Sequence, residues 1–207
     1  ISTENARCGE VQLRVAHEAQ IVGAPPVTAL CQALGLTLTA PSTPNMPFEW
    51  TVAEAFPDLE PLPQDDGPDP VVQIAYSAEF VATMDIFRRV LAIGEFSERT
   101  LRLSAEVIEL NAANYTAWQY RRKCLDELHA AAEPEARREA WKRELEFCTE
   151  AVRQNMKNYQ VWFHRRSCVE RVGDATGELA FVAEVLAEDA KNYHAWGHRQ
   201  WVLKHFS

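Results

Sequence analysis

Apolar residues recur at steps of three and four along the chain from Ser77 onward, which is the periodicity of an amphipathic α-helix. Polar residues fill the positions between them, so each segment would present one apolar face for packing. The runs occupy about 80–91, 97–110, 139–153 and 178–188. The pattern therefore predicts that the chain is helical from residue 77 to residue 207 and buries its apolar faces between helices.

Each of the last three apolar runs is followed by the same motif. The motif reads NYTAWQYRR at 114–122, NYQVWFHRR at 158–166 and NYHAWGHRQ at 192–200. Asparagine is a favoured N-cap residue, so Asn114, Asn158 and Asn192 should each start a second helix. Each run and the motif after it would then form a helical hairpin, and the chain would hold about three of them.

The spacing of the motif copies identifies the fold class. Their tyrosines are separated by 44 residues, from Tyr115 to Tyr159, and by 34 residues, from Tyr159 to Tyr193. We assign the longer interval to a polar, alanine-rich insertion at 129–139, which should lengthen the first hairpin as an exposed loop. A two-helix repeat of about 34 residues is typical of an α-solenoid. The predicted fold is all-α: a superhelix of helical hairpins similar to tetratricopeptide repeats.

The first third of the chain has a different character. Eight of the eleven prolines fall within residues 41–70, where they exclude a continuous helix or a central strand. We therefore predict an extended, proline-rich arm at 51–76 and a helical repeat domain at 77–207, and we leave 1–50 as an unassigned extension that can be disordered. Because the chain begins with Ile1 and holds few repeats for a solenoid, we expect the repeat domain to be incomplete.

Composition excludes several classes of function. A net charge of −9 and a pI near 5.2 argue against nucleic-acid binding, which needs a basic surface. No apolar run reaches the roughly 18 residues of a membrane-spanning helix. The five cysteines are widely spaced and include no CxxC pair, so they suggest neither a disulfide framework nor a structural zinc site. A cytoplasmic protein fits these features best.

Candidate nucleophiles and metal ligands are weak. We expect Cys124, Cys148 and Cys168 to be buried helical thiols, because none has a base at an informative spacing. His194 and His198 stand four residues apart, but alanine follows His194, so the HExxH metalloprotease pattern is absent. We therefore predict no metal site in this chain.

The aromatic and basic residues of one motif copy should share one face of a helix. In the second copy Tyr159, Trp162 and Arg166 stand three and four residues apart. The structural interpretation is that each tryptophan fills the gap between adjacent hairpins. The arginine pairs would then satisfy carboxylates or carbonyls of the next hairpin.

A second interpretation concerns the residue before each capping asparagine, which is Ala113 in the first copy but Lys157 and Lys191 in the others. A helix N-terminus carries free N–H groups and a partial positive charge, so it favours anions. A lysine at that point could help to bind a diphosphate or a carboxylate. The alternative is that both lysines are merely solvated.

The three NYxxWxxR copies, together with PLPQDDGPDPVVQIAYS at 61–77 and LNAANYTAWQYRR at 110–122, resemble the α subunit of protein farnesyltransferase and type I protein geranylgeranyltransferase. The resemblance implies a crescent of hairpins around a separate β subunit. It further implies transfer of a farnesyl or geranylgeranyl group from its diphosphate to the cysteine of a C-terminal CaaX sequence, as in small GTPases. Zinc would belong to the β subunit, and dependence on Mg²⁺ is left open.

The same resemblance assigns site residues. It implies that Lys157 reaches the diphosphate, that Tyr159 lies beside the diphosphate and the reacting carbon, and that Gln160 binds the terminal carboxylate of the CaaX peptide. The third copy would contribute Asn192, Tyr193 and His194 at the edge of the same cavity. Among these, Lys157, Tyr159 and His194 would be the catalytic group.

Two alternatives stay open. One is a non-catalytic helical-repeat scaffold, in which Lys157 and Gln160 would be replaceable. The other is the α subunit of the Rab geranylgeranyltransferase, which requires an escort protein and ignores short CaaX peptides. The isoprenoid preference does not follow from this chain, because the resemblance places that choice in the β subunit.

Overall fold

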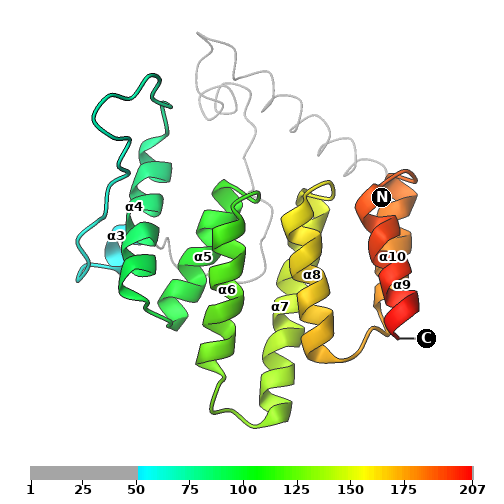
Figure 1. The fold of residues 1–207 in the computed structure, drawn as a ribbon. Coiled ribbons are helices and arrows are strands. Elements are labelled where there is room, and N and C mark those ends of the chain that lie inside the picture. The colour runs from blue at the N-terminus through cyan, green and yellow to red at the C-terminus, as the bar shows by residue number, and fades with distance from the viewer. Residues whose placement is uncertain (1–50, 207) are drawn as a thin grey trace, which may run out of the picture. The chain divides into compact units, whose positions relative to one another are not determined.

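The computed structural model describes residues 51–206, which belong to one compact unit, and these residues form helices and no strands (Figure 1). The predicted all-α superhelix of hairpins is confirmed. The helices are α3 (Val52–Ala55), α4 (Ala78–Ile93), α5 (Glu98–Leu110), α6 (Tyr115–Leu128), α7 (Pro134–Gln154), α8 (Tyr159–Val172), α9 (Glu178–Glu188) and α10 (Tyr193–His205).

Three antiparallel hairpins stand side by side in chain order: α5 with α6, α7 with α8, and α9 with α10 (Figure 1). The second helices also contact one another, since α8 packs against both α6 and α10. The predicted starts of these second helices are confirmed. Asn114, Asn158 and Asn192 each cap a helix by accepting hydrogen bonds from backbone N–H groups in its first turn.

The prediction of an exposed loop at 129–139 is wrong for most of that segment. Helix α7 begins at Pro134, which occupies the first helical position, where proline loses no hydrogen bond because the N–H there has no partner within the helix. Only residues 129–133 link α6 to α7. The additional residues therefore lengthen the first helix of the second hairpin, which has 21 residues against 13 in α5 and 11 in α9.

The arm before the repeats is extended for most of its length but begins with the short helix α3. It is tied to α4 by Arg88, whose Nε donates to the carbonyl of Leu62 at 2.9 Å, and by Arg89, whose Nε donates to the carbonyl of Glu60 at 2.8 Å. Phe56 anchors the arm in the main apolar core. The prediction for 1–50, with Cys8 and Cys31, lies outside the described residues.

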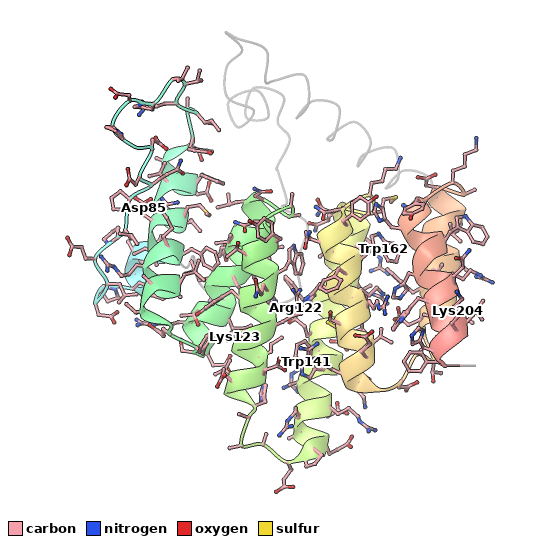
Figure 2. All side chains as sticks on the ribbon, in the orientation of Figure 1. Asp85, Arg122, Lys123, Trp141, Trp162 and Lys204 are labelled. Atoms are coloured by element: carbon pink, nitrogen blue, oxygen red, sulfur yellow. The ribbon has the colours of Figure 1, made fainter. Side chains whose placement is uncertain are left out.

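Trp118 and Trp162 close the gaps between hairpins, as predicted, whereas the prediction is wrong for the third motif tryptophan, Trp196, which is 46% exposed. The ring of Trp118 in α6 lies 4.6 Å from that of His164 in α8. Trp162 in α8 lies 6.2 Å from Phe181 in α9 and 5.4 Å from His198 in α10, and Figure 2 shows it at this junction. Both tryptophans belong to the main core.

The three cysteines within the described residues, Cys124, Cys148 and Cys168, are free and buried, which confirms the prediction. Burial raises the pKa of each thiol, so each remains protonated and is a poor nucleophile. None of the helices within 51–206 combines the length and apolar character that a membrane-spanning helix requires.

Candidate functional site

The N-termini of α6, α8 and α10 all lie at the upper edge of the hairpins in Figure 1. The loop before each of these helices is held by the tryptophan of its own motif. The indole N–H donates to the carbonyl six residues earlier: Trp118 to Ala112 at 2.9 Å, Trp162 to Met156 at 2.7 Å and Trp196 to Ala190 at 2.9 Å. In all three copies the motif thus ties the loop to the helix and caps the helix start, and in the first two its tryptophan also contacts the next hairpin.

The second and third hairpins are joined directly beneath Lys157. Asn192 is 2% exposed, and its Nδ2 donates to the carbonyl of Met156 at 3.0 Å while its Oδ1 caps α10. Both polar ends of this side chain are thus occupied within the protein. Asn192 fixes the backbone next to Lys157, and its amide is not free to contact a ligand.

Lys157 itself projects from the edge. Its side chain is 77% exposed, and its Nζ lies 3.3 Å from Asp189 Oδ2, in the loop before α10. Lys157 faces a shallow recess that is formed by its own loop, residues 154–158. An ammonium group carries three N–H donors, so donors remain for an anion beside the N-terminus of α8.

The aromatic site residues gather in a neighbouring recess between α8 and α10, with a volume of about 220 Å³. Tyr159 and His194 meet edge to face at 4.3 Å, and Tyr193 lies 5.7 Å from His194. Both tyrosine side chains are exposed. Phe163 continues the lining along α8. The structure therefore brings Tyr159, Tyr193 and His194 into one open aromatic recess.

Gln160 lies in the first turn of α8 and is half-buried. Its backbone N–H is used by the cap, donating to Asn158 Oδ1 at 2.8 Å. Within residues 51–206 the side-chain amide of Gln160 makes no hydrogen bond, so it can bind a ligand. Gln160 lines neither the recess at Lys157 nor the aromatic recess.

Buried ionic clusters join the hairpins that carry these residues, one at the junction of the first and second hairpins and one at the junction of the second and third. At the first junction Arg121 of α6 donates through Nε and Nη2 to the two carboxylate oxygens of Glu144 in α7, at 2.6 and 2.7 Å. His164 of α8 lies 2.7 Å from the same carboxylate through its Nε2. Each cluster thus connects both helices of one hairpin to an arginine of the hairpin before it.

The second junction repeats the cluster with Arg165, Glu178 and His198. Arg165 donates to the Glu178 carboxylate at 2.8 and 2.6 Å, and His198 Nε2 lies 2.7 Å from it. The other arginine of each pair behaves differently from the prediction. Arg122 lies over the Phe163 ring and Arg166 over the Trp201 ring, so these two contact aromatic faces of the next hairpin rather than its carboxylates.

Burial and charge set the protonation states at the first junction. Burial alone would raise the pKa of Glu144, but the Arg121 charge and the hydrogen bond to His164 lower it to about 2. Burial lowers the pKa of His164, which is therefore neutral. Its Nδ1 faces Arg122 Nη1 at 3.3 Å; because arginine only donates, Nδ1 is the acceptor and Nε2 carries the proton given to Glu144.

The glutamates and histidines of these clusters were missed from the sequence, although a signal exists. Both glutamates precede the next capping asparagine by 14 residues, Glu144 before Asn158 and Glu178 before Asn192. Each histidine follows its asparagine by six residues. A charge repeated at the same place in two copies is more informative than a single charge on a helix. Asp189 was also missed, because its contact with Lys157 depends on how two hairpins pack.

Metal binding by the described part of the chain has no structural support. Among residues 51–206 no group of three histidine, cysteine, aspartate or glutamate side chains is placed to hold a metal ion. His194 and His198 serve separate contacts, the first with Tyr159 and the second with Glu178.

Comparison with known proteins adds the following findings. The family model described as "Protein prenyltransferase alpha subunit repeat" matches residues 97–128, 141–172 and 176–206. These segments contain the three hairpins found in the structure, apart from the first turns of α7.

Curated relatives match part of the chain. The "Protein farnesyltransferase/geranylgeranyltransferase type-1 subunit alpha" of Solanum lycopersicum is 54% identical over 71 residues, which is 34% of this chain and 20% of the relative. The proteins of the same name from Arabidopsis thaliana and Schizosaccharomyces pombe are 49% and 41% identical over 82 and 68 residues, covering 40% and 33% of this chain. Each of these two matches spans 23% of the relative.

A solved structure shares the fold. It is described as "Candida albicans protein geranylgeranyltransferase-I complexed with GGPP" and superposes with a TM-score of 0.64 at 25% sequence identity. The match covers 78% of this chain and 51% of that chain. The chain thus corresponds to about a fifth of its curated relatives and about half of the solved structure.

Proposed function

We propose, from the premise that this chain belongs to the protein prenyltransferase alpha subunit repeat family, that it acts as the α subunit of a heterodimeric CaaX prenyltransferase. Together with a β subunit it would transfer a farnesyl or geranylgeranyl group from the isoprenoid diphosphate to the cysteine thiol of a C-terminal CaaX sequence. The similarity to relatives named as type-1 α subunits supports this proposal over a Rab-specific enzyme.

The observation that carries the proposal is the edge between the second and third hairpins. Lys157 projects there beside the N-terminus of α8, Gln160 keeps a free side-chain amide, and Tyr159, Tyr193 and His194 line an aromatic recess. Buried ionic clusters hold the helices that carry these groups. A rigid support of this kind is what a positioned catalytic group needs.

The chemistry follows from charge. As the bond between the isoprenoid carbon and the diphosphate breaks, negative charge grows on the leaving phosphate oxygens. The Lys157 ammonium would stabilise that charge, and the N-terminus of α8 adds a partial positive charge. The Tyr159 hydroxyl, on the exposed side of the aromatic recess, would donate a further hydrogen bond.

Gln160 would donate through its amide to the carboxylate that ends the CaaX peptide, which fixes the peptide's position. Zinc held by the β subunit would favour the thiolate form of the peptide cysteine, which is the nucleophile. The described residues of this chain do not fit a zinc site, so their own contribution is to bind, orient and stabilise charge.

The proposal is tested by replacing Lys157 with alanine in the complex with the β subunit. We expect kcat to fall about 100-fold with little change in the KM for a CaaX peptide, since the lysine acts on the leaving group. Lys204→Ala is the matched control, because Lys204 is also exposed but lies in the last turn of α10 (Figure 2), whereas Lys157 precedes the first turn of α8. Unchanged turnover in Lys157→Ala would favour a non-catalytic scaffold.

A further inference from the structure

Besides the buried Arg165–Glu178 pair, an ion pair at the proposed site itself crosses the junction between the second and third hairpins. Lys157 Nζ lies 3.3 Å from Asp189 Oδ2, and the carboxylate is far less exposed than the lysine, at 27% against 77%. The less exposed carboxylate can therefore restrict the conformations of the more exposed lysine.

Asp189 is itself held in place. It is the C-cap residue of α9, and its backbone N–H donates to the carbonyl of Val185 at 3.0 Å. Its Oδ1 accepts a hydrogen bond from the backbone N–H of Lys191 at 3.1 Å. One carboxylate oxygen thus shapes the loop before α10, while the other faces Lys157.

The other motif copies show that the loop does not need this charge. Asn111 occupies the corresponding place in the first hairpin, and its Oδ1 accepts from the backbone N–H of Ala113 at 3.0 Å. Asn155 occupies it in the second hairpin. In the first copy an asparagine oxygen thus accepts the same hydrogen bond, so the negative charge in the third copy is not required for it.

The extra charge coincides with the lysine. At the first junction Ala113 and Asn155 stand where Lys157 and Asp189 stand at the second, so that junction has neither charge. The aspartate thus occurs at the junction where the preceding hairpin has a lysine in contact with it.

We propose that Asp189 is a positioning residue for Lys157, an inference that rests on the proposed function of that lysine. The four-carbon side chain of a lysine has many conformations of similar energy, and an exposed one samples most of them. The Asp189 carboxylate attracts the ammonium group and so favours the conformations that keep it near the N-terminus of α8, where N–H donors remain for phosphate oxygens. Asn192 adds to this by tying the carbonyl of Met156 from the third hairpin.

Asp189→Asn in the α–β complex tests the proposal with little risk to the fold, because asparagine already occupies this place in the other two copies and makes the same hydrogen bond in the first. We expect kcat to fall about tenfold, since a displaced catalytic group loses rate steeply, while the KM for the CaaX peptide stays unchanged. In a Lys157→Ala background the same substitution should have no further effect, because nothing remains to be positioned.

Asp126→Asn is the matched control. Asp126 pairs with Arg171 at 3.0 Å, also across two hairpins and also near the surface, but at the C-terminal ends of α6 and α8. It should leave kcat unchanged.

The positioning role is overturned if Asp189→Asn keeps or raises the wild-type kcat, or if it lowers activity by the same factor with and without Lys157. The proposed function fails separately, and the positioning role with it, if Lys157→Ala alone retains full turnover. If Lys157→Ala lowers kcat about 100-fold as expected but Asp189→Asn leaves kcat unchanged, the positioning role is contradicted and the proposed function is not.

Discussion

Replacing Glu144 with glutamine should strongly destabilise the junction between the first and second hairpins, although the two side chains have nearly the same size and shape. The side chain is 3% exposed and receives two hydrogen bonds from Arg121 and one from His164. Glutamine keeps the shape but removes the negative charge, which leaves the Arg121 guanidinium buried without a counter-ion. Breaking a buried pair in this way costs about 3–5 kcal/mol.

This loss is large against the roughly 5–15 kcal/mol by which a domain is stable. Urea unfolding followed by tryptophan fluorescence measures it, since Trp118 packs on His164 beside the cluster. With a slope of about 2 kcal/mol per molar urea, the midpoint should fall by roughly 2 M. Glu150→Gln is the control: Glu150 is exposed on the same helix, and its loss should change stability by less than about 0.5 kcal/mol.

A double variant separates charge from packing. Arg121→Met combined with Glu144→Gln removes both buried charges and leaves an amide oxygen for His164 to donate to. It should be more stable than Glu144→Gln alone, because the uncompensated charge is gone. If Glu144→Gln costs no more than Glu150→Gln, the ionic cluster does not hold the hairpins together and the reasoning is refuted.

Two further predictions concern pH and peptide binding. The pKa of His164 lies below its ordinary value of 6.5, so below pH 6.5 the unfolded chain takes up a proton that the folded chain does not. The free energy of unfolding should therefore fall as pH drops from 6.5 to 5, by at most about 1.4 kcal/mol per pH unit for this group. Below pH 4.5 the depressed pKa of Glu144, about 2, causes a second loss of stability, because the unfolded chain is protonated before the folded one. Urea titrations across this pH range measure both losses. If His164→Gln leaves the pH dependence of stability between pH 6.5 and 5 unchanged, the first prediction is contradicted. Gln160→Ala should raise the KM for the peptide about tenfold in the α–β complex, since a hydrogen bond to a charged group contributes about 1.5–3 kcal/mol. Gln119→Ala, on the exposed side of α6, should leave this KM unchanged. Equal KM values for the two variants would remove the proposed role of Gln160.

The helix starts were predictable because their cause is local. An asparagine cap depends on residues within one turn, so Asn114, Asn158 and Asn192 could be identified from three copies of one motif. The start of α7 at Pro134 was not, since a proline after an alanine-rich stretch is as typical of a loop as of a first helical turn.

The contacts between hairpins were only partly predictable. Tryptophan is large and apolar, so the burial of Trp118 and Trp162 between repeats could be expected from their spacing, but the same spacing did not reveal that Trp196 is exposed. The burial of Glu144 could not, because a glutamate on an amphipathic helix is usually solvated. The pairing of Asp189 with Lys157, and the burial of Asn192 beneath them, depend on the orientation of two hairpins, which no single helix encodes.

The central claim, that this chain completes a CaaX prenyltransferase, is tested most directly by reconstitution. The chain is co-expressed with a farnesyltransferase-type β subunit, and transfer to a fluorescent CaaX peptide is measured with farnesyl diphosphate and with geranylgeranyl diphosphate. We expect transfer by the complex and none by either subunit alone. A stable complex that transfers neither isoprenoid would contradict the account and identify the chain as a scaffold.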